Sequence, residues 1–310
     1  MSVTFVIIKL LNLLVTFVII KSRSMSMNYN ISEDLITIRK ILNISQNDLA
    51  KELGISKMTI IRIENNITYP NDINLNKIYD FAYKKNIKLN YLKEMFYKEE
   101  LLENEVVFFH GTKTDIIGNI SPFVGRERLD FGKGFYCGEN SYQTISFISK
   151  YDGSSMYILK ASLDGLQFYK FNVDTEWMLA VAYYRQMLDE KSNHPLILKI
   201  KEKIINSDYI IAPIADNRMF QIIDRFIEGE ITDEQCKHCL AATDLGFQYV
   251  FLTERATSKI KILERCYIPT AERNKYEEKR ELDMNDSNMK VKMAMIKYKN
   301  KGKYIEEILK

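Results

Sequence analysis

Two stretches near the middle of the chain contain residue types that could form a binding or catalytic site. Phe109-His110-Gly111-Thr112 ends an apolar run, and Asp130-Phe131-Gly132-Lys133-Gly134-Phe135-Tyr136 follows it. Each also has a plain structural interpretation. A His-Gly pair can simply end a strand, and Gly-Lys-Gly can be an ordinary loop or a cradle for phosphate. The Gly-x-x-x-x-Gly-Lys-Ser/Thr spacing of a P-loop is absent, which excludes that motif.

Taken together, the two stretches resemble the ADP-ribosyltransferase superfamily, particularly the branch with diphtheria toxin and the poly(ADP-ribose) polymerases. That family has His-Gly on its first strand, then Phe-Gly-Lys-Gly-x-Tyr, then a further aromatic residue, whose place here is taken by Phe147. A late strand of the family begins with Glu, and Gln248 stands there in this chain. Residues 106–267 also resemble a bacterial domain family of unknown function, number 3990. The resemblance implies an α+β, ADP-ribosyltransferase-like fold.

The resemblance further implies NAD as the substrate. His110 would hold a ribose of NAD, Gly111 would present backbone groups to the nicotinamide carboxamide, and Thr144 would add a hydroxyl. Tyr136 and Phe147 would sandwich the nicotinamide ring. Cleavage of the N-glycosidic bond develops positive charge on the ribose, so such a site must clamp the ring and stabilise that charge. The predicted cofactor-binding residues are His110, Gly111, Thr112, Gly134, Tyr136, Thr144, Phe147, Asp216 and Arg218.

Gln248 is the main departure from the family pattern, and with His110 and Tyr136 it completes the predicted catalytic set. A carboxylate there could bind the ribose 2′-hydroxyl, stabilise the cation and activate an acceptor, whereas an amide does only the first well. The amide argues against elongation of poly(ADP-ribose) chains. Mono-ADP-ribosylation and binding without catalysis both remain open. Glu254, six residues further on, is less well placed to replace it.

Several other residues have both a functional and a structural interpretation. Asp216 and Arg218 follow an apolar strand and could place an acid and a base in a cleft, or could be a helix cap and a surface residue. Trp177, the single tryptophan, is expected in the core. Cys236 and Cys239 resemble half a zinc site without a matching second pair, so we predict no metal.

An earlier segment has the pattern of a helix-turn-helix. Ser45 and Ser56 are N-cap signals, and Gly54 between them is a turn signal. Apolar residues at helical spacing predict five short helices over residues 28–97, and the segment resembles the Xre/Cro repressor family. By that resemblance Gln46 would contact a DNA phosphate, and the start of the third helix would face base edges. The predicted DNA-binding residues are Gln46, Ser56, Lys57, Met58, Thr59 and Arg62.

The two ends of the chain are less informative. Residues 3–20 are mostly apolar and are followed by basic residues, so residues 1–27 are either a short membrane anchor or translated upstream sequence ahead of a true start at Met25 or Met27. Residues 269–310 form a charged tail to which we assign no chemistry. The chain has 310 residues and a net charge of only +3, so any nucleic-acid contact must come from a local patch.

The sequence therefore predicts a multidomain protein, with an all-α DNA-binding domain at residues 28–97 and an α+β domain at residues 105–268. The leading hypothesis is a cytoplasmic mono-ADP-ribosyltransferase fused to a DNA-binding domain, acting on an unknown acceptor as a toxin, phage-defence effector or autoregulator. The alternative is a transcriptional regulator whose second domain binds NAD or ADP-ribose without catalysis. Repressor-type domains often dimerise to match two half-sites, so a homodimer is also expected.

Overall fold

A computed structural model describes residues 27–242 and 246–310. Five helices come first: α2 (Ile31–Leu42), α3 (Gln46–Leu53), α4 (Lys57–Glu64), α5 (Asp72–Lys84) and α6 (Leu89–Glu99). The predicted signals operate as expected: the Ser45 and Ser56 side chains cap α3 and α4, and Gly54 ends α3 in the left-handed conformation. Asn66, shortly after α4, adopts the left-handed conformation, with a φ of 55°. The helical first domain is thereby confirmed.

Seven strands in the described residues form one mixed sheet in the order β4-β5-β6-β2-β1-β3-β7. They are β1 (Glu105–Thr112), β2 (Phe135–Gly138), β3 (Ser155–Ser162), β4 (Phe168–Lys170), β5 (Tyr209–Pro213), β6 (Phe247–Phe251) and β7 (Ile260–Tyr267). All neighbours are antiparallel except β4 and β5. The sequence pattern did not predict β2 or β4, which are the two shortest strands.

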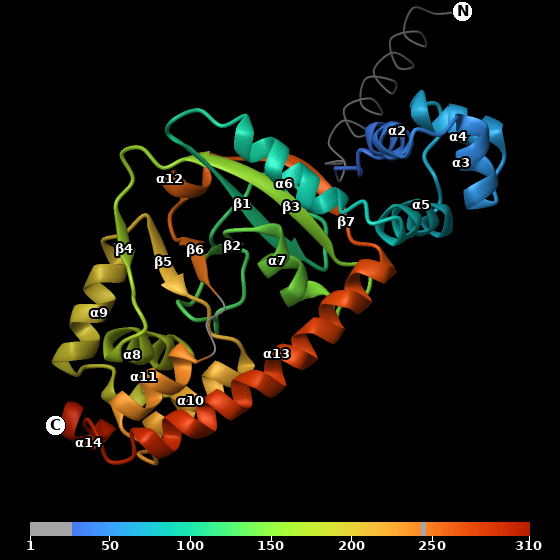
Figure 1. The fold of residues 1–310 in the computed structure, drawn as a ribbon. Coiled ribbons are helices and arrows are strands. Elements are labelled where there is room, and N and C mark those ends of the chain that lie inside the picture. The colour runs from blue at the N-terminus through green and yellow to red at the C-terminus, as the bar shows by residue number, and fades with distance from the viewer. Residues whose placement is uncertain (1–26, 243–245) are drawn as a thin grey trace, which may run out of the picture.

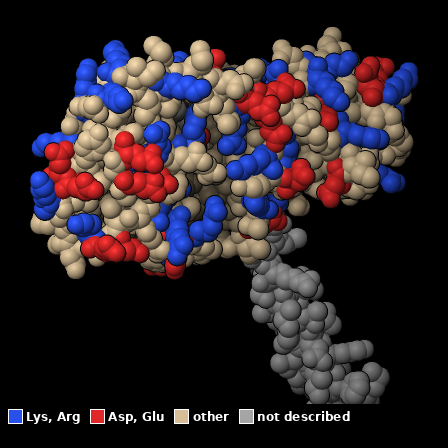
Figure 2. All heavy atoms as spheres, turned by 90° about the horizontal axis from the view of Figure 1, so that it is seen from below, with Lys and Arg blue, Asp and Glu red and all other residues tan. Residues whose placement is uncertain are grey.

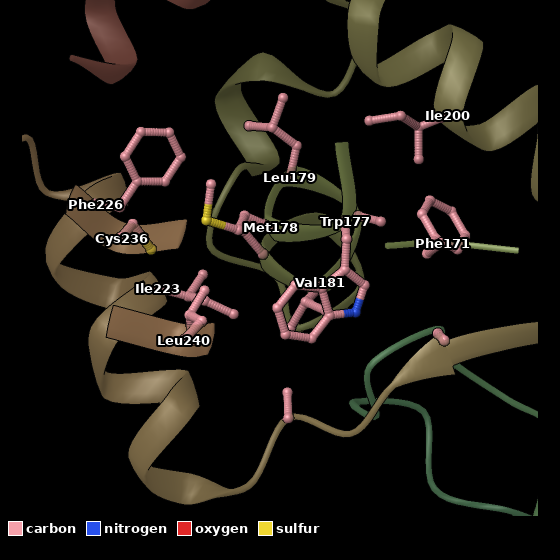
Figure 3. Close-up of a cluster of buried hydrophobic side chains, with 14 of the residues drawn as sticks. Phe171, Trp177, Met178, Leu179, Val181, Ile200, Ile223, Phe226, Cys236 and Leu240 are labelled. Atoms are coloured by element: carbon pink, nitrogen blue, oxygen red, sulfur yellow. The ribbon is translucent and has the colours of Figure 1, made fainter. Parts of the chain in front are cut away.

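Helices surround this sheet: α7 (Ser141–Ile148), α8 (Thr175–Tyr184), α9 (Pro195–Ile205), α10 (Asn217–Ile227), α11 (Asp233–Ala241) and α12 (Glu254–Thr257). The largest core lies between α8–α11 and one face of the sheet and includes Val250. Figure 3 shows Trp177 within it, and that side chain is fully buried, as predicted. Phe108, Phe135 and Phe251 belong to a separate cluster on the opposite sheet face, because side chains alternate along a strand.

The charged C-terminal segment is a structural part of the second domain. Residues Thr270–Lys297 form the long helix α13, and α14 (Ile305–Ile308) follows. In Figure 1, α13 runs along the outside of the molecule from the first domain towards α11. Ile305 and Leu309 are buried in the main core, and Gln235 of α11 donates to the Met295 carbonyl at 3.0 Å. The apolar end of this segment and the hydrogen bond from Gln235 attach it to the second domain, although its composition suggested only a tail.

The two domains pack directly on each other at β7 and the start of α13. Lys93 of α6 bridges Asp34 of α2 at 2.7 Å and Glu264 of β7 at 2.6 Å, with all three side chains largely buried. Tyr267 stacks on Tyr79 of α5 with 5.0 Å between ring centroids. This contact makes the junction an ordered interface.

The predicted membrane anchor or misassigned start at residues 1–27 lies outside the described residues, except for Met27. Among the helices that are described, none is long and apolar enough to cross a membrane. All four cysteines are buried and free, including Cys236 and Cys239 on α11. Figure 2 shows basic and acidic side chains interspersed over one face of the molecule.

Candidate functional site

The predicted His-Gly pair lies where β1 and β2 separate. Their register is defined at Phe109 and Gly138 only. Just beyond that pair, Nδ1 of His110 lies 2.7 Å from the Tyr136 carbonyl. A carbonyl only accepts, so Nδ1 must carry the proton and Nε2 is left as an acceptor. The ring stacks on Phe135, and burial lowers the pKa of His110 although the bond to the Tyr136 carbonyl opposes this. His110 is therefore a neutral acceptor near pH 7.

Glycines and Thr144 pack closely beside this point of separation. A Cβ on Gly111 would lie 2.6 Å from Ile148 and 3.1 Å from the Thr144 methyl group. A Cβ on Gly138 would lie 2.8 Å from the Thr144 hydroxyl. Gly138 is also the cross-strand partner of Gln248. The structure thus brings three of the predicted site residues, Gly111, Thr144 and Gln248, close to one another around bare glycine backbone.

A buried polar network surrounds Gln248 and has Asp130 at its centre. Nε2 of Gln248 donates to Asp130 at 2.9 Å and to the Pro213 carbonyl at 3.2 Å. Arg185, at the end of α8, pairs with the same carboxylate through Nε at 3.0 Å and also donates to the Ala215 carbonyl. Both acceptors around Nε2 require N–H groups, which fixes the amide orientation. Oε1 of Gln248 is therefore an acceptor, and no described group donates to it.

Tyr136 lies on the same face of the sheet as Gln248. Gln248 pairs with Gly138, and Tyr136 is two residues from Gly138 on the same strand, so both side chains point to the same side. The Tyr136 hydroxyl donates to the Gly132 carbonyl at 2.9 Å and accepts from the Phe131 amide at 3.1 Å. Burial, with the nearby Asp130 charge, raises the pKa of Tyr136 well above its ordinary value. Tyr136 is thus a neutral side chain that fixes the loop before β2. His110 projects to the opposite face, so the predicted catalytic set does not converge on one point.

Arg218 has the least conventional environment of the predicted site residues. It lies in the first turn of α10, two residues after Asp216, whose carboxylate caps that helix by accepting from two backbone amides. Nε and Nη1 of Arg218 are buried, and no described group accepts from either. Buried, charged N–H groups without acceptors cost free energy, so an anion at these two nitrogens would be stabilised. Asp216 therefore acts as a helix cap, whereas no contact among the described residues explains the buried nitrogens of Arg218.

Three other predicted residues have local structural roles. Thr112 forms a short turn with Thr114 through its hydroxyl. Gly134 is required by packing, since a Cβ there would lie 2.7 Å from Val250. Lys133, between the two glycines of the suggested phosphate cradle, pairs with Glu127 of the same loop at 3.0 Å. Phe147 is 55% exposed on α7, and its only ring contact among the described residues is with Lys150.

The residues predicted to contact DNA lie at the start of α3, in the case of Gln46, and at and along α4 for the others. Ser56 caps the helix, and Lys57, Met58 and Arg62 are exposed. Neither Lys57 nor Arg62 forms an ion pair with any described residue, so both charges are available for phosphates. Thr59 is half-buried, and its hydroxyl contacts Ser56 at 2.8 Å.

Gln46 is held by the core of this domain. Its amide donates to Glu64 at 2.6 Å, and Arg39 pairs with the same carboxylate at 2.8 Å. Burial alone would raise the pKa of Glu64, but the hydrogen bonds from Arg39 and Gln46 outweigh it and lower the pKa. Only one N–H of Gln46 is used in this way, so the other can still donate to a phosphate.

Family comparisons match both domains. A family model described as a protein of unknown function, DUF3990, matches residues 106–262, which is just over half of the chain. The chain belongs to the DUF3990 family. A helix-turn-helix model matches residues 35–80, so the first domain is the DNA-binding part of a regulator. Searches of curated proteins and of solved structures found no match.

The DUF3990 domain as matched begins in β1 and ends in β7, so it contains the whole site but not α13. Sequence reasoning missed Asp130 and Arg185, which decide how Gln248 is oriented. Asp130 could have been suspected because it precedes the Phe-Gly turn, but its partners lie 55 and 118 residues further along the chain. Nothing in the local sequence indicates those pairings.

Proposed function

We propose that this protein is a DNA-binding regulator whose DUF3990 domain binds an NAD-type dinucleotide without transferring ADP-ribose from it. The observation that carries the proposal is at Arg218, whose buried Nε and Nη1 have no acceptor among the described residues. A pyrophosphate offers anionic acceptors of the geometry that a guanidinium binds well. Oε1 of Gln248, on the same sheet face as Tyr136, is an acceptor that suits a ribose hydroxyl. The identity of the ligand rests on the resemblance of this domain to ADP-ribosyltransferases.

The hydrogen-bond network around Gln248 favours binding over transfer of ADP-ribose. The amide donates to Asp130, and Asp130 is already paired with Arg185. A glutamate at position 248 would place two carboxylates in contact, which is unfavourable in a buried site. Gln248 is therefore matched to its neighbours. A neutral amide can accept from a ribose hydroxyl but contributes no charge to stabilise an oxocarbenium ion.

The binding test uses Arg218→Leu, with Arg225→Leu on the same helix as its control because Arg225 is exposed and paired with Glu230. We expect calorimetry of the full chain to show binding of NAD or ADP-ribose. Arg218→Leu should weaken it at least tenfold, about 1.4 kcal/mol, without lowering the free energy of unfolding, since the unpaired charge costs stability. Arg225→Leu should bind like the wild type. Absence of binding to both ligands, or unchanged binding by Arg218→Leu, would contradict the proposal.

Transfer is tested separately with NAD labelled on its adenylate part, incubated with the protein and cell extract. We expect no label on protein, nucleic acid or small molecules. Label transfer that disappears in His110→Ala would overturn the claim of binding without catalysis and establish the mono-ADP-ribosyltransferase instead.

A further inference from the structure

Helix α13 has an apolar stripe on the side that faces away from the rest of the molecule. Leu282, Met289, Met293 and Ile296 are 68%, 71%, 68% and 74% exposed. Their spacing of seven, four and three residues places them on one face of a helix. The opposite side of α13, including Val291 and Met295, packs on the main core. The stripe is therefore not used within the described chain.

Along the part of α13 that carries the stripe, acidic residues come first and lysines follow. Residues 281–286 contain Glu281, Asp283 and Asp286 and no Lys or Arg, whereas residues 288–297 contain Lys290, Lys292 and Lys297 and no acid. None of these six forms an ion pair among the described residues. A second α13 in antiparallel orientation would place acids against lysines, whereas a parallel one would oppose like charges.

We propose that α13 is a homodimer interface in which the α13 helices of two copies pack antiparallel about Met289. In that register Met289 meets Met289 of the second copy, and Leu282 lies opposite its Ile296. Asp286 then lies near Lys290 of the second copy. The stripe spans about 21 Å of helix at 1.5 Å per residue. Such a contact falls at the small end of stable interfaces, so we expect a dissociation constant of roughly micromolar. Two copies would also supply two DNA-reading helices. This inference is independent of the proposed ligand.

Sedimentation of the full chain tests the contact. Wild type should dimerise, and Met289→Lys should raise the dissociation constant at least about tenfold because two lysines would face each other. Ile205→Lys is the matched control, since Ile205 is 72% exposed on α9, outside the stripe, and should not matter. Asp286→Lys and Lys290→Asp should each weaken the dimer, and the two combined in one chain should restore it. A chain that stays monomeric at its highest soluble concentration would overturn the proposal, as would a dimer insensitive to Met289→Lys.

Cross-linking tests the orientation. The four native cysteines are buried, so an introduced thiol reports alone. Met289→Cys should form an intermolecular disulfide under mild oxidation, because position 289 meets itself. Leu282→Cys should not, because its two copies would lie about 21 Å apart. Efficient cross-linking of Leu282→Cys would indicate a parallel pair and contradict the antiparallel arrangement.

Discussion

Position 248 shows how the chemistry of one residue is set by its neighbours. Gln248 is nearly buried and donates to a carboxylate that an arginine already neutralises. The network needs a donor at this position, and glutamate supplies none when ionised. The amide is thus part of the structure of the site as well as a candidate ligand contact.

Gln248→Glu should destabilise the protein by about 3 kcal/mol near neutral pH, since it leaves buried acceptors facing a buried carboxylate. The loss should shrink at acidic pH, where the new carboxyl can be protonated. Adding Asp130→Asn should recover part of the loss by supplying a donor. Urea unfolding measures the free energy of unfolding of Gln248→Glu at neutral and acidic pH and of the double variant, with the exposed Gln167→Glu as control. A fully stable Gln248→Glu protein would mean that the described network is not what holds this position.

A single residue, Arg62, can be used to test the predicted DNA-binding face. Its exposed and unpaired guanidinium on α4 should contact a phosphate or a base edge. Arg62→Ala should weaken binding to the protein's own promoter fragment, and loss of a phosphate contact lowers the slope of log affinity against log salt by about one. Arg225→Ala, which removes an arginine from the second domain, should leave both quantities unchanged. If Arg62→Ala behaves like this control, the assigned face is wrong.

The first turn of α13 is the element at which the two domains meet. Glu272 is buried there and accepts from Asn90 of α6 at 2.8 Å. Burial raises the pKa of Glu272 from 4.5 to about 7, although the Asn90 bond and nearby cations oppose it. Folding therefore favours the protonated acid. The stability this group contributes is complete below about pH 4.5 and is lost as the pH rises through 7.

Glu272→Gln should consequently match the wild type at pH 4.5 and be more stable at pH 8, by about 3 kcal/mol at most. The amide keeps an acceptor for Asn90 but has no charge to bury. Unfolding free energies at several pH values measure this, and Glu277→Gln, exposed on the same helix, is the control. A difference between Glu272→Gln and wild type that does not grow with pH would contradict the raised pKa.

At the scale of the whole molecule, one lysine connects the DNA-binding domain to the sheet. Lys93 lies between Asp34 of the first domain and Glu264 of the second. Burial alone would lower the pKa of Lys93, but the surrounding negative groups raise it above its ordinary value, so the charge is retained. This contact, together with the aromatic stack of Tyr79 and Tyr267, means that the two domains should unfold together.

Lys93→Met should cost about 3–5 kcal/mol, because it leaves two buried carboxylates facing each other without a cation. Adding Glu264→Gln should restore part of the loss. Lys85→Met removes a lysine from the same domain whose side chain is 47% exposed, and should be nearly neutral. Thermal unfolding would show whether a single transition becomes two in Lys93→Met. An unchanged midpoint would argue against the bridge as a structural contact.

Sequence alone determined the features that depend on neighbours along the chain. Ser45, Ser56 and Gly54 define helix ends through their own side-chain and backbone chemistry, so the helix-turn-helix could be placed correctly. The longer strands could be predicted for the same reason, from runs of residues that share a local preference. The His-Gly and Phe-Gly-Lys-Gly stretches likewise located the candidate site.

Only the tertiary structure decided what those residues face. Pairing of β2 with β6 put Gln248 beside Gly138, and pairing of β1 with β2 put His110 and Tyr136 on opposite faces. The meeting of Asp130, Arg185 and Gln248 joins a loop, a helix end and a strand that are distant in sequence. Charge composition made residues 269–310 look like a tail, whereas a few apolar residues far along it attach it to the core. Local preferences act over a few residues, and contacts between distant segments follow from how the whole chain packs.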